Sequence, residues 1–206
     1  EVLFSRADRA MFFAKAQERN QTCFFLDMTT KSIGKKELYI QNRLATAINA
    51  QQIQAWFQPV IAADSGRCTS VEVLARWQDK EQGWISPATF IPMAENLGLI
   101  HELGQQVLQA SLAAAQRWQE NGLNLTMAIN VSKRQLFTPY FTERLKEQVA
   151  KHNIDPHRIT LEITESVAML DVEHAVDRVL EIRQAGFQIA LDDFGTGYSS
   201  LSQLHE

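Results

Sequence analysis

Three apolar segments, LTMAIN (Leu125–Asn130), RITLEIT (Arg158–Thr164) and FQIALDD (Phe187–Asp193), alternate with two helical segments, Pro139–His152 and Asp171–Ala185. This order of strand, helix and strand predicts an α/β fold, with a parallel sheet and helices packed outside it. The spacing fits either an open doubly wound sheet or a closed barrel. No GxGxxG motif follows a strand, which disfavours a dinucleotide-binding fold.

The preceding part of the chain predicts two more strands and a helix. IQAWFQPVI (Ile53–Ile61) and CTSVEVLARW (Cys68–Trp77) are separated by a short turn, which predicts a β-hairpin. The pair Ser86-Pro87 is typical of a helix start, and Gly98 is typical of its end. The sheet is therefore expected to begin with an antiparallel pair before its parallel strands.

The composition of the 206 residues excludes several function classes. Hydrophobic residues make up 45% and charged residues 21%, with a net charge of −4 and no basic block, which disfavours disorder and binding to a long nucleic acid. Cys23 and Cys68 form no CxxC pair, and the five histidines form no zinc-binding spacing. No apolar run approaches the ~20 residues that span a bilayer, and no signal peptide is evident. Any metal is expected to be held mainly by oxygen.

Oxygen-bearing side chains recur on the predicted strands, near the carboxyl end of most of them. They are Glu72, Asn130, Glu162, Asp192 and Asp193. The carboxyl ends of parallel strands meet at one site, and acidic groups in buried strands are costly unless paired or bound to a cation. Carboxylate and amide oxygens favour Mg²⁺ or Mn²⁺ over zinc or copper.

Each of these residues also has an ordinary structural interpretation. Glu72 can form a salt bridge with Arg76, which lies on the same strand face, and Asn130 can cap the helix that follows it. Asp192-Asp193 can form a turn and a helix cap before the GTG at 195–197. Three aromatic residues of the hairpin are expected in the core rather than stacked on bases: Trp56, Phe57 and Trp77.

Taken together, these residues resemble the EAL family of bacterial cyclic di-GMP phosphodiesterases. The matching motifs, in chain order, are FQPV (57–60), EVLARW (72–77), SPATFIPMAENLGLI (86–100), NVS (130–132), LEITES (161–166) and DDFGTGYSSL (192–201). Six motifs in the family's order over about 150 residues make the resemblance specific. It implies a TIM-like (β/α) barrel, only partly covered by this chain, and hydrolysis of cyclic di-GMP to linear pGpG with Mg²⁺ or Mn²⁺. The alternative is an EAL module that binds cyclic di-GMP without cleaving it.

The resemblance also assigns roles to residues. The implied metal ligands are Glu72, Asn130, Glu162, Asp192 and Asp193. Of these, Glu72, Asp192 and Asp193 are expected to take part in catalysis, together with Glu165, which resembles a glutamate that anchors the DFG loop. Gln58 and Arg76 resemble substrate-binding residues, with Arg76 directed towards a phosphate. The sequence departs from the family in having Val73 for alanine and Phe57 for tyrosine, and the family's downstream lysine and glutamates lie beyond Glu206.

The segment before the hairpin resembles part of another domain. ADRAMFFAKAQERN (7–20) resembles the closing helix of a GGDEF domain, although no GGDEF signature is present. We therefore expect a GGDEF tail at 1–27, a linker and connector helix at 28–52, and a truncated EAL domain at 53–206. The expected parent is a cytoplasmic GGDEF–EAL protein with sensor domains, dimeric through its EAL domain, with any membrane anchor outside this segment.

Overall fold

A computed structural model describes residues 35–164 and 172–192. The chain divides into two compact units, residues 1–46 and 47–206, and helix α3 (Lys35–Asn49) crosses their boundary. The predicted GGDEF tail and the first part of the predicted linker lie outside the described residues. The sheet and the candidate site belong to the second unit.

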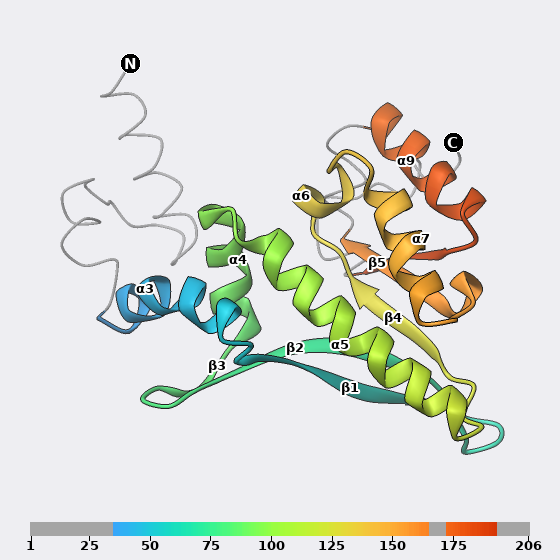
Figure 1. Cartoon of the computed structure of the whole chain (residues 1–206), viewed down its shortest axis with the longest axis horizontal. Helices are drawn as coiled ribbons and strands as arrows, with labels where there is room; N and C mark the ends of the chain where they lie inside the picture. The colour runs from blue at the N-terminus through green and yellow to red at the C-terminus, as the bar shows by residue number, and fades with distance from the viewer. Residues whose placement is uncertain (1–34, 165–171, 193–206) are drawn as a thin grey trace, which may run out of the picture. The chain divides into compact units, whose positions relative to one another are not determined.

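The second unit is built on a six-stranded sheet (Figure 1). Its strands are β1 (Ile53–Ile61), β2 (Cys68–Asp79), β3 (Gly83–Ile85), β4 (Thr126–Asn130), β5 (Ile159–Thr164) and β6 (Gln188–Asp192). The order is β1-β2-β4-β5-β6, with β3 paired to β2. β1 and β2 form the predicted antiparallel pair, whereas the pairs β2–β4, β4–β5 and β5–β6 are parallel. The predicted parallel α/β sheet is therefore confirmed.

Helices connect the parallel strands. They are α4 (Pro87–Leu97), α5 (Ile100–Glu120), α6 (Lys133–Leu136), α7 (Phe141–Lys151), the 3-10 turn η1 (Pro156–Arg158) and α9 (Val172–Gln184). As predicted, Ser86 is the N-cap of α4 and Gly98 ends it in the left-handed conformation, with φ of 75°. No helix in residues 35–164 and 172–192 is long and apolar enough to cross a membrane.

One face of the hairpin packs against helices α4 and α5. Phe57 of β1 meets Trp118 of α5 edge to face, with ring centroids 4.8 Å apart. Trp77 of β2 is fully buried against Phe90 of α4, at 5.8 Å. Because side chains alternate along a strand, every second residue of β1 and β2 points away from these helices.

The opposite face of the hairpin carries the functional candidates. Glu72 and Leu74 of β2 lie on this face, as does Trp56, which pairs with Leu74 across the two strands. Trp56 is 48% exposed, so its predicted place in the core is wrong, whereas the prediction for Trp77 is correct. The physical reason is strand alternation, which sends neighbouring aromatic residues of β1 to opposite faces.

Candidate functional site

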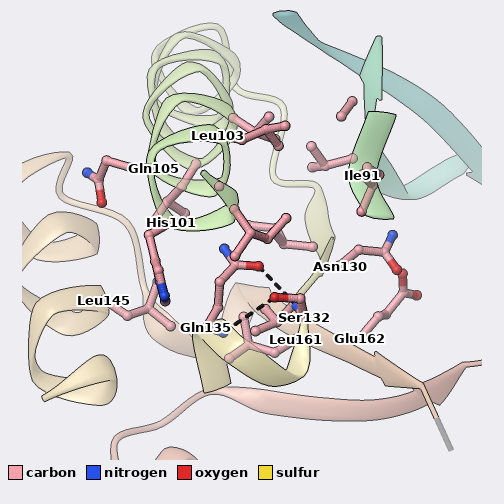
Figure 2. Close-up of a pocket in the computed structure, with 18 of the residues that line it drawn as sticks. Ile91, His101, Leu103, Gln105, Asn130, Ser132, Gln135, Leu145, Leu161 and Glu162 are labelled. Carbon is pink, nitrogen blue, oxygen red and sulfur yellow. Dashed lines mark hydrogen bonds between the residues drawn. The ribbon is translucent and has the colours of Figure 1, made fainter. Parts of the chain in front are cut away.

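Three of the predicted site residues meet at the same face of neighbouring strands. Glu72 of β2 lies beside Ala128 of β4, two residues before Asn130. Asn130 ends β4 and lies directly beside Glu162 of β5. The Nδ2 of Asn130 donates to Oε1 of Glu72 at 3.4 Å, and Figure 2 shows the side chains of Asn130 and Glu162 adjacent to each other. Registered parallel strands therefore bring together residues that lie up to 90 positions apart in sequence.

Glu162 lies in an environment that disfavours its ionised form. Its Oε2 is buried without a hydrogen-bond partner among the described residues. Burial raises the pKa of Glu162 above its ordinary value, and the negative charges of Glu72 and Asp192 raise it further. A proton or a cation would relieve this repulsion.

Asp192 completes the described part of the acidic group. It is the last residue of β6, is exposed, and lies beside Thr164 of β5. The negative charge of Asp192 contributes to the raised pKa of Glu162. Asp193 and Glu165, the other two predicted acidic residues, lie outside the described residues.

The predicted substrate-binding residues lie on the hairpin. Gln58 of β1 is exposed and lies directly opposite Glu72. The Nη1 of Arg76 donates to the carbonyl oxygen of Ala75 at 3.0 Å. In the described part of the chain Arg76 forms no ion pair, so the alternative interpretation of a Glu72–Arg76 salt bridge is wrong. The guanidinium retains donors for an anionic ligand.

A cavity of about 700 Å³ opens beside the acidic group. Its sheet wall includes Arg76, Asn130 and Glu162, and helices α4 and α5 contribute Ile91 and Leu103 (Figure 2). Apolar and polar side chains both line it, and the polar ones include Arg144 and Gln148 of the helix layer. Most of its wall lies on the face of the sheet that packs against the helices, and Glu72 is not among the residues that line it.

The loop after β4 is fixed by contacts that the sequence analysis did not identify. The N–H of Ser132 donates to Oε1 of Gln135 at 3.0 Å, and the N–H of Gln135 donates to Oγ of Ser132 at 3.3 Å. The cap of α6 is thus Ser132, not Asn130, and the S-x-x-Q spacing was the available signal. Val131 donates its N–H to the carbonyl oxygen of Glu162 at 2.9 Å. These contacts fix the backbone that carries the Asn130 side chain.

Gly104 of α5 provides the space for Gln135. A Cβ at position 104 would lie 3.0 Å from Cδ of Gln135 and closer still to its Nε2. Any side chain at 104 would therefore displace the amide that binds the Ser132 N–H. Through Gln135, Gly104 is thus linked to the backbone of Ser132, two residues after Asn130.

The donor set suits a hard divalent cation. Two carboxylates, Glu72 and Glu162, flank the amide of Asn130, and Mg²⁺ and Mn²⁺ prefer such oxygen ligands. Among the described residues, no three His, Cys, Asp or Glu side chains gather closely enough to bind a metal by themselves. Oε2 of Glu162, which has no hydrogen-bond partner in the part of the chain that the structure describes, is free to bind such a cation.

A family model and the sequences of known proteins both match this chain. Residues 41–206 match the family described as the EAL domain. The chain is 34% identical over 203 residues to the bifunctional diguanylate cyclase/cyclic di-GMP phosphodiesterase MucR of Pseudomonas aeruginosa. It is 37% identical over 203 residues to the cyclic di-GMP phosphodiesterase PdeR of Escherichia coli. Both alignments cover 98% of this chain and 30% of the relative.

A solved structure shows the same architecture. The PaMucR phosphodiesterase in complex with c-di-GMP superposes with a TM-score of 0.76 at 32% identity. The match covers 81% of this chain and 68% of that one. The predicted EAL type of fold, partly covered by this chain, is therefore confirmed.

Proposed function

The chain belongs to the EAL domain family of cyclic di-GMP phosphodiesterases, and on that premise we propose that it hydrolyses cyclic di-GMP to linear pGpG. The observation that carries the proposal is the meeting of Glu72, Asn130 and Glu162 on one sheet face. The relatives named as phosphodiesterases and the relative solved with c-di-GMP support the choice of substrate.

We assign the acidic residues and Asn130 to the binding of a cation. Glu72, Asn130, Glu162 and Asp192 would hold Mg²⁺ or Mn²⁺, and we assign Asp193 to the same group on sequence. A bound cation of this kind supplies a Lewis acid for the phosphoryl oxygens and a more acidic water. We assign Glu165 to the support of the loop that follows Asp192.

The protein groups around the phosphate bind and orient it. The guanidinium of Arg76 presents donors to two phosphate oxygens, which fixes the orientation of the phosphodiester. Gln58, opposite Glu72, provides an amide that can donate to the substrate or position water.

The test is chromatography of cyclic di-GMP incubated with the 206-residue chain and Mn²⁺ or Mg²⁺. We expect linear pGpG, its loss on chelation, and its loss in Glu72→Gln. The matched control is Glu147→Gln, the same change at an exposed position of α7, which should leave turnover unchanged.

The outcomes separate the candidate functions. Turnover retained by Glu72→Gln contradicts the assigned roles. Binding of cyclic di-GMP without product under all cation conditions supports the non-catalytic binding module instead. The absence of both cyclic di-GMP binding and pGpG would contradict both functions for this chain.

A further inference from the structure

Two tryptophans form an exposed pair on the sheet. Trp56 of β1 and Trp84 of β3 are 48% and 51% exposed, and their rings meet edge to face, with centroids 5.2 Å apart at an interplanar angle of 81°. Both strands pair with β2, so the rings converge across that strand. Large aromatic side chains that cluster while half exposed commonly mark a binding surface.

The pair presents its ring faces to a ligand. The indole N–H of Trp56 donates to Oε1 of Gln54 at 3.2 Å, which satisfies its polar group. In an edge-to-face pair only one face of one ring is covered by the other ring. The remaining faces are suited to stacking with a flat, weakly polar group such as a nucleobase.

The register places this pair beside the proposed phosphate-binding residue. Trp56 lies opposite Leu74, which separates Glu72 from Arg76 on the same face of β2. Diagonal cross-strand neighbours have backbones about 7–8 Å apart, within reach of long and aromatic side chains. Trp84 lies opposite Gln78, two residues beyond Arg76 on that face.

A nucleotide carries a base and a phosphate that are separated by one sugar, so neighbouring sites for a flat ring and for a phosphate suit it. Arg76 makes its described hydrogen bond to the backbone of Ala75 and leaves donors for a phosphate. On the basis of the proposed function, we propose that the Trp56–Trp84 pair stacks one guanine base of cyclic di-GMP. The two indoles thereby contribute to substrate affinity and to the preference for a purine.

The experiment measures the affinity of the chain for cyclic di-GMP by calorimetry in EDTA, without turnover. Trp56→Ala and Trp84→Ala should each weaken binding by roughly 5- to 150-fold, the range for loss of one base–aromatic stack. Trp56→Phe keeps an aromatic face and should retain most of the affinity. The matched control is Trp118→Phe, because Trp118 packs against Phe57 on the opposite face of the sheet.

A second measurement uses the intrinsic fluorescence of the four tryptophans. Cyclic di-GMP should quench the wild type and Trp118→Phe, whereas quenching should disappear in Trp56→Phe/Trp84→Phe. Wild-type affinity in both alanine variants, with their folding checked by circular dichroism, overturns the inference while leaving the proposed function intact. Failure of the wild-type chain to bind and to yield product overturns both.

Discussion

Substitution of Gly104 by alanine should weaken Mn²⁺ binding while leaving the unfolding free energy nearly unchanged. The added Cβ would lie 3.0 Å from Cδ of Gln135, where ordinary contacts begin near 3.4 Å, and closer to Nε2. The Gln135 side chain must therefore retreat by about 0.5 Å or more, which breaks its 3.0 Å bond to the Ser132 N–H. The backbone that carries Asn130 then loses one of its constraints.

The effects on unfolding free energy should nearly cancel. Alanine in place of glycine inside a helix stabilises by about 1 kcal/mol, and Gly104 lies within α5. Loss of the reciprocal cap on α6 costs about 0.5–2 kcal/mol. We therefore expect a change in unfolding free energy within about 1 kcal/mol of zero, together with a reduced affinity for Mn²⁺ because the backbone after Asn130 is less constrained.

The assay pairs denaturant unfolding with Mn²⁺ titration followed by electron paramagnetic resonance. Gln135→Ala removes the same hydrogen bond and also vacates the space, so Gly104→Ala in that background should stabilise by about 1 kcal/mol. Mn²⁺ affinity should be reduced in both single variants and the double variant. A loss of more than about 3 kcal/mol in Gly104→Ala, or unchanged Mn²⁺ affinity, would refute the reasoning.

Three further changes test the site and the core. In chelator at alkaline pH, Glu162→Gln should melt at a higher temperature than the wild type, because the raised pKa of Glu162 means that the wild type loses stability as the pH rises through that pKa. Thermal melts should show this advantage vanishing below the ordinary glutamate pKa, and Mn²⁺ should stabilise only the wild type. Trp77→Ala should cost about 3–5 kcal/mol in denaturant unfolding. Trp77→Phe should cost clearly less, because the buried Nε1 of Trp77 has no hydrogen-bond partner among the described residues. Arg158→Met should cost about 1–3 kcal/mol in the same measurement, since the guanidinium donates twice to the carbonyl oxygen of Leu125, at 3.1 and 2.7 Å, and once to Gln119 at 2.9 Å.

The order of strands and helices along the chain was predictable because each long element has a recognisable residue pattern. Strands β1, β4 and β5 lie within one residue of their predicted bounds, since apolar runs of five to nine residues end at turn residues. The meeting of Asn130 and Glu162 followed from the general rule that parallel strands align their carboxyl ends. The prediction needed only that these strands be parallel.

Short elements and side-chain choices were not predictable in the same way. Strand β3 has three residues and α6 has four, which is too short for a periodic pattern. The direction of the Arg76 guanidinium, towards the Ala75 carbonyl rather than Glu72, depends on local geometry that sequence spacing does not determine. The same holds for the contact of Gly104 with Gln135, whose partners are 31 positions apart on two different helices.

Stability alone does not account for the acidic group. Among the described residues, one buried oxygen of Glu162 has no hydrogen-bond partner, and Glu72 and Asp192 repel its charge, so a neutral residue of similar size would make the metal-free chain more stable. The capped loop and the space left by Gly104 further restrict where Asn130 can lie beside these carboxylates. A costly arrangement of charge that is also held in position is expected where a cation offsets the repulsion, which is the physical reason to place the chemistry of this chain at Glu72, Asn130 and Glu162.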